Sequence, residues 1–175
     1  MAGSLVLLDS ETVSSAVSTV DLGGANWDTS YDVYRVVVSN VVTGTDTKSL
    51  LFRHLDSSNN VITSSNYDVA FKVLRTDTSF EDAYGSGTWA YVVDNYIGTD
   101  TGEVGNTVMH LFNSNDATEY TYHTIESAYV TNAGVLRGGQ GGGFYDVAAA
   151  TKGVQFFMSS GNIASGTFKL YGIKK

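Results

Sequence analysis

The chain has 175 residues, 16% charged residues and a formal net charge of −8, and it contains neither cysteine nor proline. This length predicts one domain over residues 1–175, since domains usually run to roughly 100–200 residues. The missing cysteines exclude disulfides, thiolate zinc sites and a cysteine nucleophile. The acidic balance, without a local lysine or arginine cluster, argues against binding to nucleic acid or to a membrane surface.

Residues 1–30 are predicted to form either an N-terminal arm or edge strands, with strands expected over 4–9 and 14–20. The apolar run of Leu5, Val6, Leu7 and Leu8 is short, and no positive charge precedes it, so a signal peptide is not indicated. The loop over 23–30 holds Trp27, which we expect to be exposed and available for a ligand or partner contact.

The middle of the chain alternates apolar and polar residues with a period of two, which predicts strands with one face in the core. Further strands are expected over 31–40, 48–55, 66–74, 88–94, 106–112 and 119–126. Trp89 and Tyr91 lie on one of these alternating strands and are predicted to be core residues. The predicted core includes Tyr34, Val36, Phe52, Val69, Phe71, Trp89, Phe156, Phe168 and Leu170.

His110 and His123 lie on two consecutive predicted strands. If these strands form a hairpin that turns at Asp116 and Ala117, the two imidazoles become a cross-strand pair on one sheet face. Two ligands are too few for a zinc site, which needs three or four. We therefore expect two exposed or partner-facing histidines, and no metal or cofactor.

The glycine cluster over 138–143, with the sequence GGQGGG, invites comparison with a phosphate-binding loop. It fails the G-x-G-x-x-G spacing, and no helix is predicted after it. We expect a flexible hairpin loop between short strands over 133–137 and 144–149. The stretch 84–87 around Ser86 is also expected to be a loop, and no G-x-S-x-G motif indicates a hydrolase.

Strands over 153–159 and 166–173 complete the series. Three Thr-Asp-Thr tripeptides, at 45–47, 76–78 and 99–101, favour turns at strand ends over calcium sites, because no D-x-D-x-D-G loop is present. Many short strands, with no helical periodicity, predict an all-β domain: an antiparallel, jelly-roll-like β-sandwich. No constellation of residues indicates an enzyme.

The closing stretch 163–173, IASGTFKLYGI, resembles the last strand of β-sandwich modules in the virions of tailed bacteriophages. The segment 34–42, YRVVVSNVV, followed by LLFRHL at 50–55 and by the strand with Tyr67, resembles other strands of the same family. The resemblance spans residues 31–173. Members of this family are trimeric capsid cement or decoration proteins, related to distal modules of tailspikes and fibres.

The resemblance implies a structural, non-enzymatic virion protein. We expect a homotrimer on the outer capsid surface that binds the major capsid protein and reinforces the assembled shell. The expected capsid contacts are Leu5, Val6, Leu7 and Leu8. The alternative is a receptor-binding module of a tail fibre or tailspike that recognises a host surface glycan, with Trp27, His110 and His123 as possible contacts. Decoration is favoured because the chain carries no fibre stalk or coiled coil.

Overall fold

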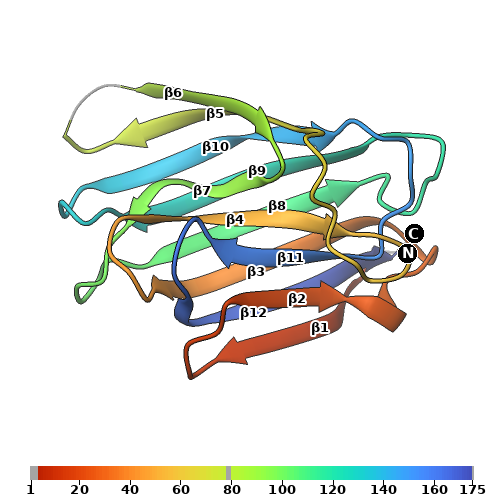
Figure 1. Cartoon of the computed structure of the whole chain (residues 1–175), viewed down its shortest axis with the longest axis horizontal. Coiled ribbons are helices and arrows are strands. Elements are labelled where there is room, and N and C mark those ends of the chain that lie inside the picture. The colour runs from red at the N-terminus through yellow and green to blue at the C-terminus, as the bar shows by residue number, and fades with distance from the viewer. Residues whose placement is uncertain (1–3, 78–79, 175) are drawn as a thin grey trace.

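The computed structural model describes residues 4–77 and 80–174, except for the side chains of 94 and 95. Twelve strands and one short 3-10 helix, η1 (Gly24–Asn26), make up the described elements. The strands form two antiparallel sheets, and Figure 1 views the larger sheet through the smaller one. No described helix is long and apolar enough to cross a membrane.

The larger sheet has eight strands in the order β1-β12-β3-β8-β9-β10-β5-β6. Their bounds are β1 (Leu5–Val13), β12 (Ile163–Lys174), β3 (Tyr31–Thr43), β8 (Gly105–Phe112), β9 (Thr121–Val130), β10 (Leu136–Tyr145), β5 (Tyr67–Arg75) and β6 (Glu81–Gly87). The smaller sheet has four strands in the order β2-β11-β4-β7. Their bounds are β2 (Thr19–Gly23), β11 (Gly153–Met158), β4 (Lys48–Leu55) and β7 (Ala90–Ile97).

The strand order is that of a jelly roll with additions. The quartets β1-β12-β3-β8 and β2-β11-β4-β7 are the two sheets that a pair of Greek keys produces. Two hairpins are added to this frame: β5–β6 follows β4 in the chain, and β9–β10 follows β8. They lengthen the larger sheet beyond β8, and we call these four strands the extension. The predicted fold class, an all-β antiparallel sandwich with a jelly-roll arrangement, is confirmed.

The core lies between the sheets and follows the predicted alternation. Every predicted core residue is buried except Trp89 and Tyr91; Trp89 is partly exposed between β6 and β7. Strand β7 begins at Ala90, and Ala90 and Val92 face the core. Tyr91, on the alternate face, is therefore only half-buried and meets the Trp89 ring edge-on at 4.8 Å. The core prediction for Trp89 and Tyr91 was wrong by one step of the alternation.

The glycine cluster is not a loop but the middle of β10, which pairs with β9 on one side and β5 on the other. A Cβ on Gly141 would collide with the carbonyl oxygen of Ala70 and with Phe71. A Cβ on Gly143 would collide with the carbonyl oxygen of Asp68 and with the His123 ring. Glycine is needed here because neighbouring backbone and rings approach so closely.

The expectation of a loop around Ser86 was wrong, whereas the N-terminal residues form edge strands, one of the two expected alternatives. The stretch around Ser86, expected as a loop, belongs to β6, the edge strand that pairs with β5. Residues 5–13, one of whose alternatives was a free arm, form β1, which pairs with β12 along its length at the other edge. Strand β2 is an edge strand of the smaller sheet.

Candidate functional site

The outer face of the extension, which points away from the smaller sheet, is hollowed into a groove of about 770 Å³. No strand of the described chain covers this face. The side chains that point outward there come from all four strands of the extension. The groove is lined by Tyr122 and Thr124 of β9, Phe144 of β10, Asp68 and Ala70 of β5, and Tyr84 and Ser86 of β6, with Phe112 of β8 beside them and the backbone of β10 below.

The pairing registers arrange these side chains in two rows across the sheet. In one row Phe112 is opposite Tyr122, Tyr122 opposite Phe144, and Phe144 opposite Asp68. The next row runs through Thr124, Gly142, Ala70 and Tyr84. The first row therefore builds an aromatic wall, and the second row, with its small side chains, forms a floor that ends at a tyrosine.

The aromatic wall is a continuous cluster. The Phe144 ring centroid lies 5.8 Å from that of Tyr122 and 6.0 Å from that of Tyr120, with which it stacks nearly parallel. At the far side Tyr84 is 84% exposed, because β6 is the edge strand and nothing in the described chain packs against its ring. An exposed aromatic at each side of a hollow is costly to leave in water unless a ligand covers it.

The floor is low because β10 contributes no side chain at its centre. Gly142 lies between Thr124 and Ala70, and a Cβ there would collide with the carbonyl oxygen of His123. The close approach of the strands thus keeps the floor at backbone level. A ligand resting on it would reach peptide groups as well as the walls.

Asp68 supplies the carboxylate that lines the groove. Its side chain is partly buried, and within the described chain it makes no hydrogen bond or ion pair. The nearest lysine in the register, Lys72, is already bound to Asp82, with 2.6 Å between Nζ and Oδ1. The Asp68 carboxylate therefore has open acceptor positions toward the groove.

The predicted pairing of His110 with His123 is wrong by one residue. In the structure His110 is opposite Thr124, and His123 is opposite Leu111. The buried residues Leu111 and Ile125 set this register, since a one-residue slip would turn both to solvent. His110 thus stays on the outer face, half-buried, while His123 points into the core and is 2% exposed.

His123 meets a second buried histidine, His54 of β4. Both rings lie edge-on to Phe52, at centroid distances of 5.0 and 5.4 Å, and the His54 ring stacks on Tyr67 at 5.8 Å. Burial lowers the pKa of both imidazoles to about 3, and for His123 the neighbouring His54 lowers it further. Both are therefore neutral core residues. The sequence analysis did not single out His54, because an apolar strand with one histidine gives no hint of a buried partner.

Trp27, expected as an exposed contact, is a core residue and only 3% exposed. Its ring stacks on Tyr34 at 3.9 Å, nearly parallel. The Asn115 amide donates hydrogen bonds to the Tyr34 hydroxyl at 2.7 Å and to the carbonyl oxygen of Asp28 at 2.6 Å, which closes the loop over the stack. Trp27 is therefore unavailable to a ligand.

The four residues predicted to contact a capsid all lie on β1. Leu5 and Leu7 point to the outer face and are 48% and 54% exposed. Val6 and Leu8 are half-buried, and Leu8 packs against the core at the bulge where the pairing with β12 shifts. The row that contains Leu5 continues through half-buried apolar residues to the groove. We call this row the outer apolar row: Leu5, Ile173, Val33, Phe112, Tyr122 and Phe144.

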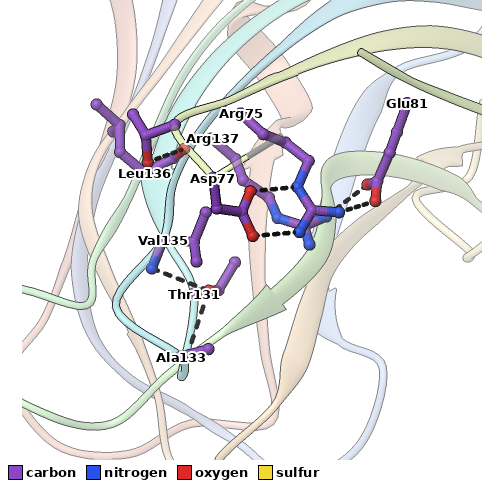
Figure 2. Close-up of polar contacts among 9 residues, drawn as sticks. Arg75, Asp77, Glu81, Thr131, Ala133, Val135, Leu136 and Arg137 are labelled. Atoms are coloured by element: carbon purple, nitrogen blue, oxygen red, sulfur yellow. Dashed lines mark hydrogen bonds and ion pairs between the residues drawn. The ribbon is translucent and has the colours of Figure 1, made fainter. Parts of the chain in front are cut away.

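A charged cluster fixes the far end of the extension (Figure 2). Arg75 binds Asp77 through two hydrogen bonds of 2.6 and 2.8 Å, and it also donates to Glu81. Arg137 of β10 donates to the other oxygen of Glu81 at 2.8 Å. Two cations and two anions balance, so the cluster ties β5, β6 and β10 together instead of presenting free charge. It thereby holds the edge strand that carries Tyr84.

Comparison of the chain with protein-family models, with curated proteins and with solved structures found no match.

Proposed function

We propose that this chain is a saccharide-binding module whose binding site is the groove on the extension. The observation that carries the proposal is the pair of aromatic surfaces, Tyr84 on one side and Tyr122 with Phe144 on the other, across a floor without large side chains. A pyranose ring has apolar C–H faces that pack on aromatic rings. Its hydroxyl groups donate to a carboxylate such as that of Asp68.

Binding without hydrolysis fits the groove better than a glycosidase does. Glycosidases generally place two carboxyl groups on either side of the scissile bond. Among the described residues that line the groove, Asp68 is the one carboxylate. The floor has small side chains and the groove is open at the top. Both features suit a saccharide chain that lies across the sheet and is bound without being cleaved.

The setting we propose is the virion of a tailed phage, where the module recognises a glycan of the host surface. Two observations support this: the resemblance of residues 31–173 to virion β-sandwich modules, and the jelly-roll strand order that the resemblance implied. The groove favours the receptor-binding alternative over capsid decoration. Of the contacts expected from sequence, His110 lies next to the floor, opposite Thr124, whereas Trp27 and His123 are buried.

Capsid decoration remains a second candidate, supported by the outer apolar row. Leu5 and Leu7 are exposed leucines on a sheet face that no described strand covers. Contiguous exposed apolar residues of this kind commonly mark protein contacts. Assembly into a homotrimer, or binding to the major capsid protein, would bury these leucines together with the open edge of β1.

The test is calorimetric titration of the whole chain with uncharged and charged oligosaccharides. Tyr84→Ala is expected to weaken binding by about tenfold, which corresponds to about 1.4 kcal/mol. The fold should be unaffected, because the ring is 84% exposed. Tyr96→Ala, which removes a tyrosine 51% exposed on the other sheet, is the matched control and should bind as the wild type does. Binding that is absent from the wild type, or unchanged in Tyr84→Ala, refutes the proposal.

A further inference from the structure

The charge of the groove suggests which saccharides it accepts. Asp68 has no ionic partner in the described chain, and it lies beside aromatic rings. Lys72 and Asp82 neutralise each other on the same face, and Glu126 also points outward there, where Gln140 contacts it. The whole chain carries a formal net charge of −8. A ligand near Asp68 therefore meets a negative charge, and Arg35, a cation on the same sheet face, lies on β3, four strands away from β5 in the sheet order.

Covering the groove with a ligand removes water from the Asp68 carboxylate. A carboxylate that loses its water without gaining another partner is unfavourable, so the ligand must replace the lost hydration. Hydroxyl groups do so in part. A protonated amine does so more completely, because it adds charge to the hydrogen bond.

The aromatic rings around Asp68 also favour a cationic ligand. Phe144 is directly opposite Asp68 on the neighbouring strand, and Tyr84 is its diagonal neighbour on the other side. Directly opposed residues have Cβ atoms about 5 Å apart, and diagonal ones are still within reach of an aromatic side chain. An ammonium group bound to Asp68 would therefore lie within reach of the Phe144 and Tyr84 side chains, and aromatic ring faces attract cations.

We infer that the groove selects saccharides that carry a free, protonated amino group, held by Asp68 between Phe144 and Tyr84. This inference rests on the proposed saccharide-binding function and names the class of ligand for the same site. N-acetylated sugars lack the charge and bind more weakly. Uronic acids carry the opposite charge and are repelled by the same carboxylate.

The experiment compares two probes that differ only in the amine, the tetramer of glucosamine and the tetramer of N-acetylglucosamine. At a slightly acidic pH the wild type should bind the glucosamine tetramer about tenfold more tightly, as expected for one charge-assisted hydrogen bond. Asp68→Asn should reduce this ratio to about one, because it should weaken binding of the glucosamine tetramer by much more than binding of the acetylated tetramer. Added salt should shrink the ratio in the wild type, because Asp68 is partly exposed.

The control is Asp82→Asn, which removes a carboxylate of the same sheet face that lies outside the groove and is paired with Lys72. It should keep the preference for glucosamine. Equal binding of both tetramers, with loss of both in Tyr84→Ala, would overturn the inference and leave saccharide binding standing. If neither tetramer binds, the result counts against both the inference and the proposed function.

Discussion

Acidification should destabilise this fold well above the pH at which carboxylates titrate, through His54 and His123. Both are fully buried, and burial lowers their pKa from 6.5 to about 3. In the native state they stay neutral, whereas in the unfolded chain each takes up a proton as the pH falls through 6.5. Below that pH the unfolded state binds more protons, so stability is lost progressively from about pH 6.5 down to about pH 3.

The magnitude follows from the two pKa values. Each histidine contributes about 1.4 kcal/mol per pH unit below 6.5, so the pair should lower the free energy of unfolding by about 4 kcal/mol between pH 7 and pH 5. This is a large part of the roughly 5–15 kcal/mol that stabilises a typical domain. Asp56, Asp77 and Asp116, whose pKa values their hydrogen bonds lower, act in the same direction only at more acidic pH.

Urea unfolding followed by tryptophan fluorescence at the two pH values measures this loss. Replacing either buried histidine by leucine removes one titrating group, so His54→Leu and His123→Leu should each reduce the pH-dependent loss by about half. His110→Gln is the control: that imidazole is half-buried on the outer face, and its pKa is lowered mainly by burial, to a lesser extent. It should leave most of the loss in place. A pH-dependent loss that is as large in both leucine variants as in the wild type would refute the reasoning.

Two further predictions concern the glycines of β10 and the outer apolar row. Gly143→Ala should lower the free energy of unfolding by about 1–3 kcal/mol through overpacking, whereas Gly138→Ala, whose Cβ would meet its nearest atom at 3.7 Å, should have a much smaller effect in the same unfolding assay. If Leu5 of the outer apolar row and the neighbouring exposed Leu7 mediate self-association, light scattering should show that the double variant Leu5→Ser, Leu7→Ser has a lower mass than the wild type at equal concentration. A wild type that is already monomeric would remove this support for a trimer.

The sequence predicted the parts of the fold that depend on alternation. Phe71, Phe156 and Phe168 lie where a period of two places them, because an apolar face buried on one side leaves a clear pattern. It did not predict where a turn begins. The loop between β8 and β9 is offset by one residue from the expected turn, and that offset alone moved His123 from the surface to the core.

The sequence did not predict strand β10 over the glycine cluster, nor the groove, and the reason is different. Glycine has no side chain to bury, so the run in β10 contains no pattern of its own, and its conformation depends on Phe71 and His123 from the flanking strands. The groove depends on the same pairing. Tyr122 and Tyr84 are ordinary strand residues in the sequence, and only the β9-β10-β5-β6 order brings them to one hollow.

The two hairpins of the extension enter the chain separately, and this has a consequence for folding kinetics. Tyr122 and Phe144 come from one hairpin, and Asp68 and Tyr84 from the other, so neither hairpin alone contains both walls of the groove. They meet only where β10 pairs with β5, between residues that are far apart in sequence. Contacts of long sequence separation generally form slowly. If the groove binds a ligand as proposed, gain of binding during refolding therefore reports pairing of the two hairpins in the β9-β10-β5-β6 extension, not formation of either hairpin alone.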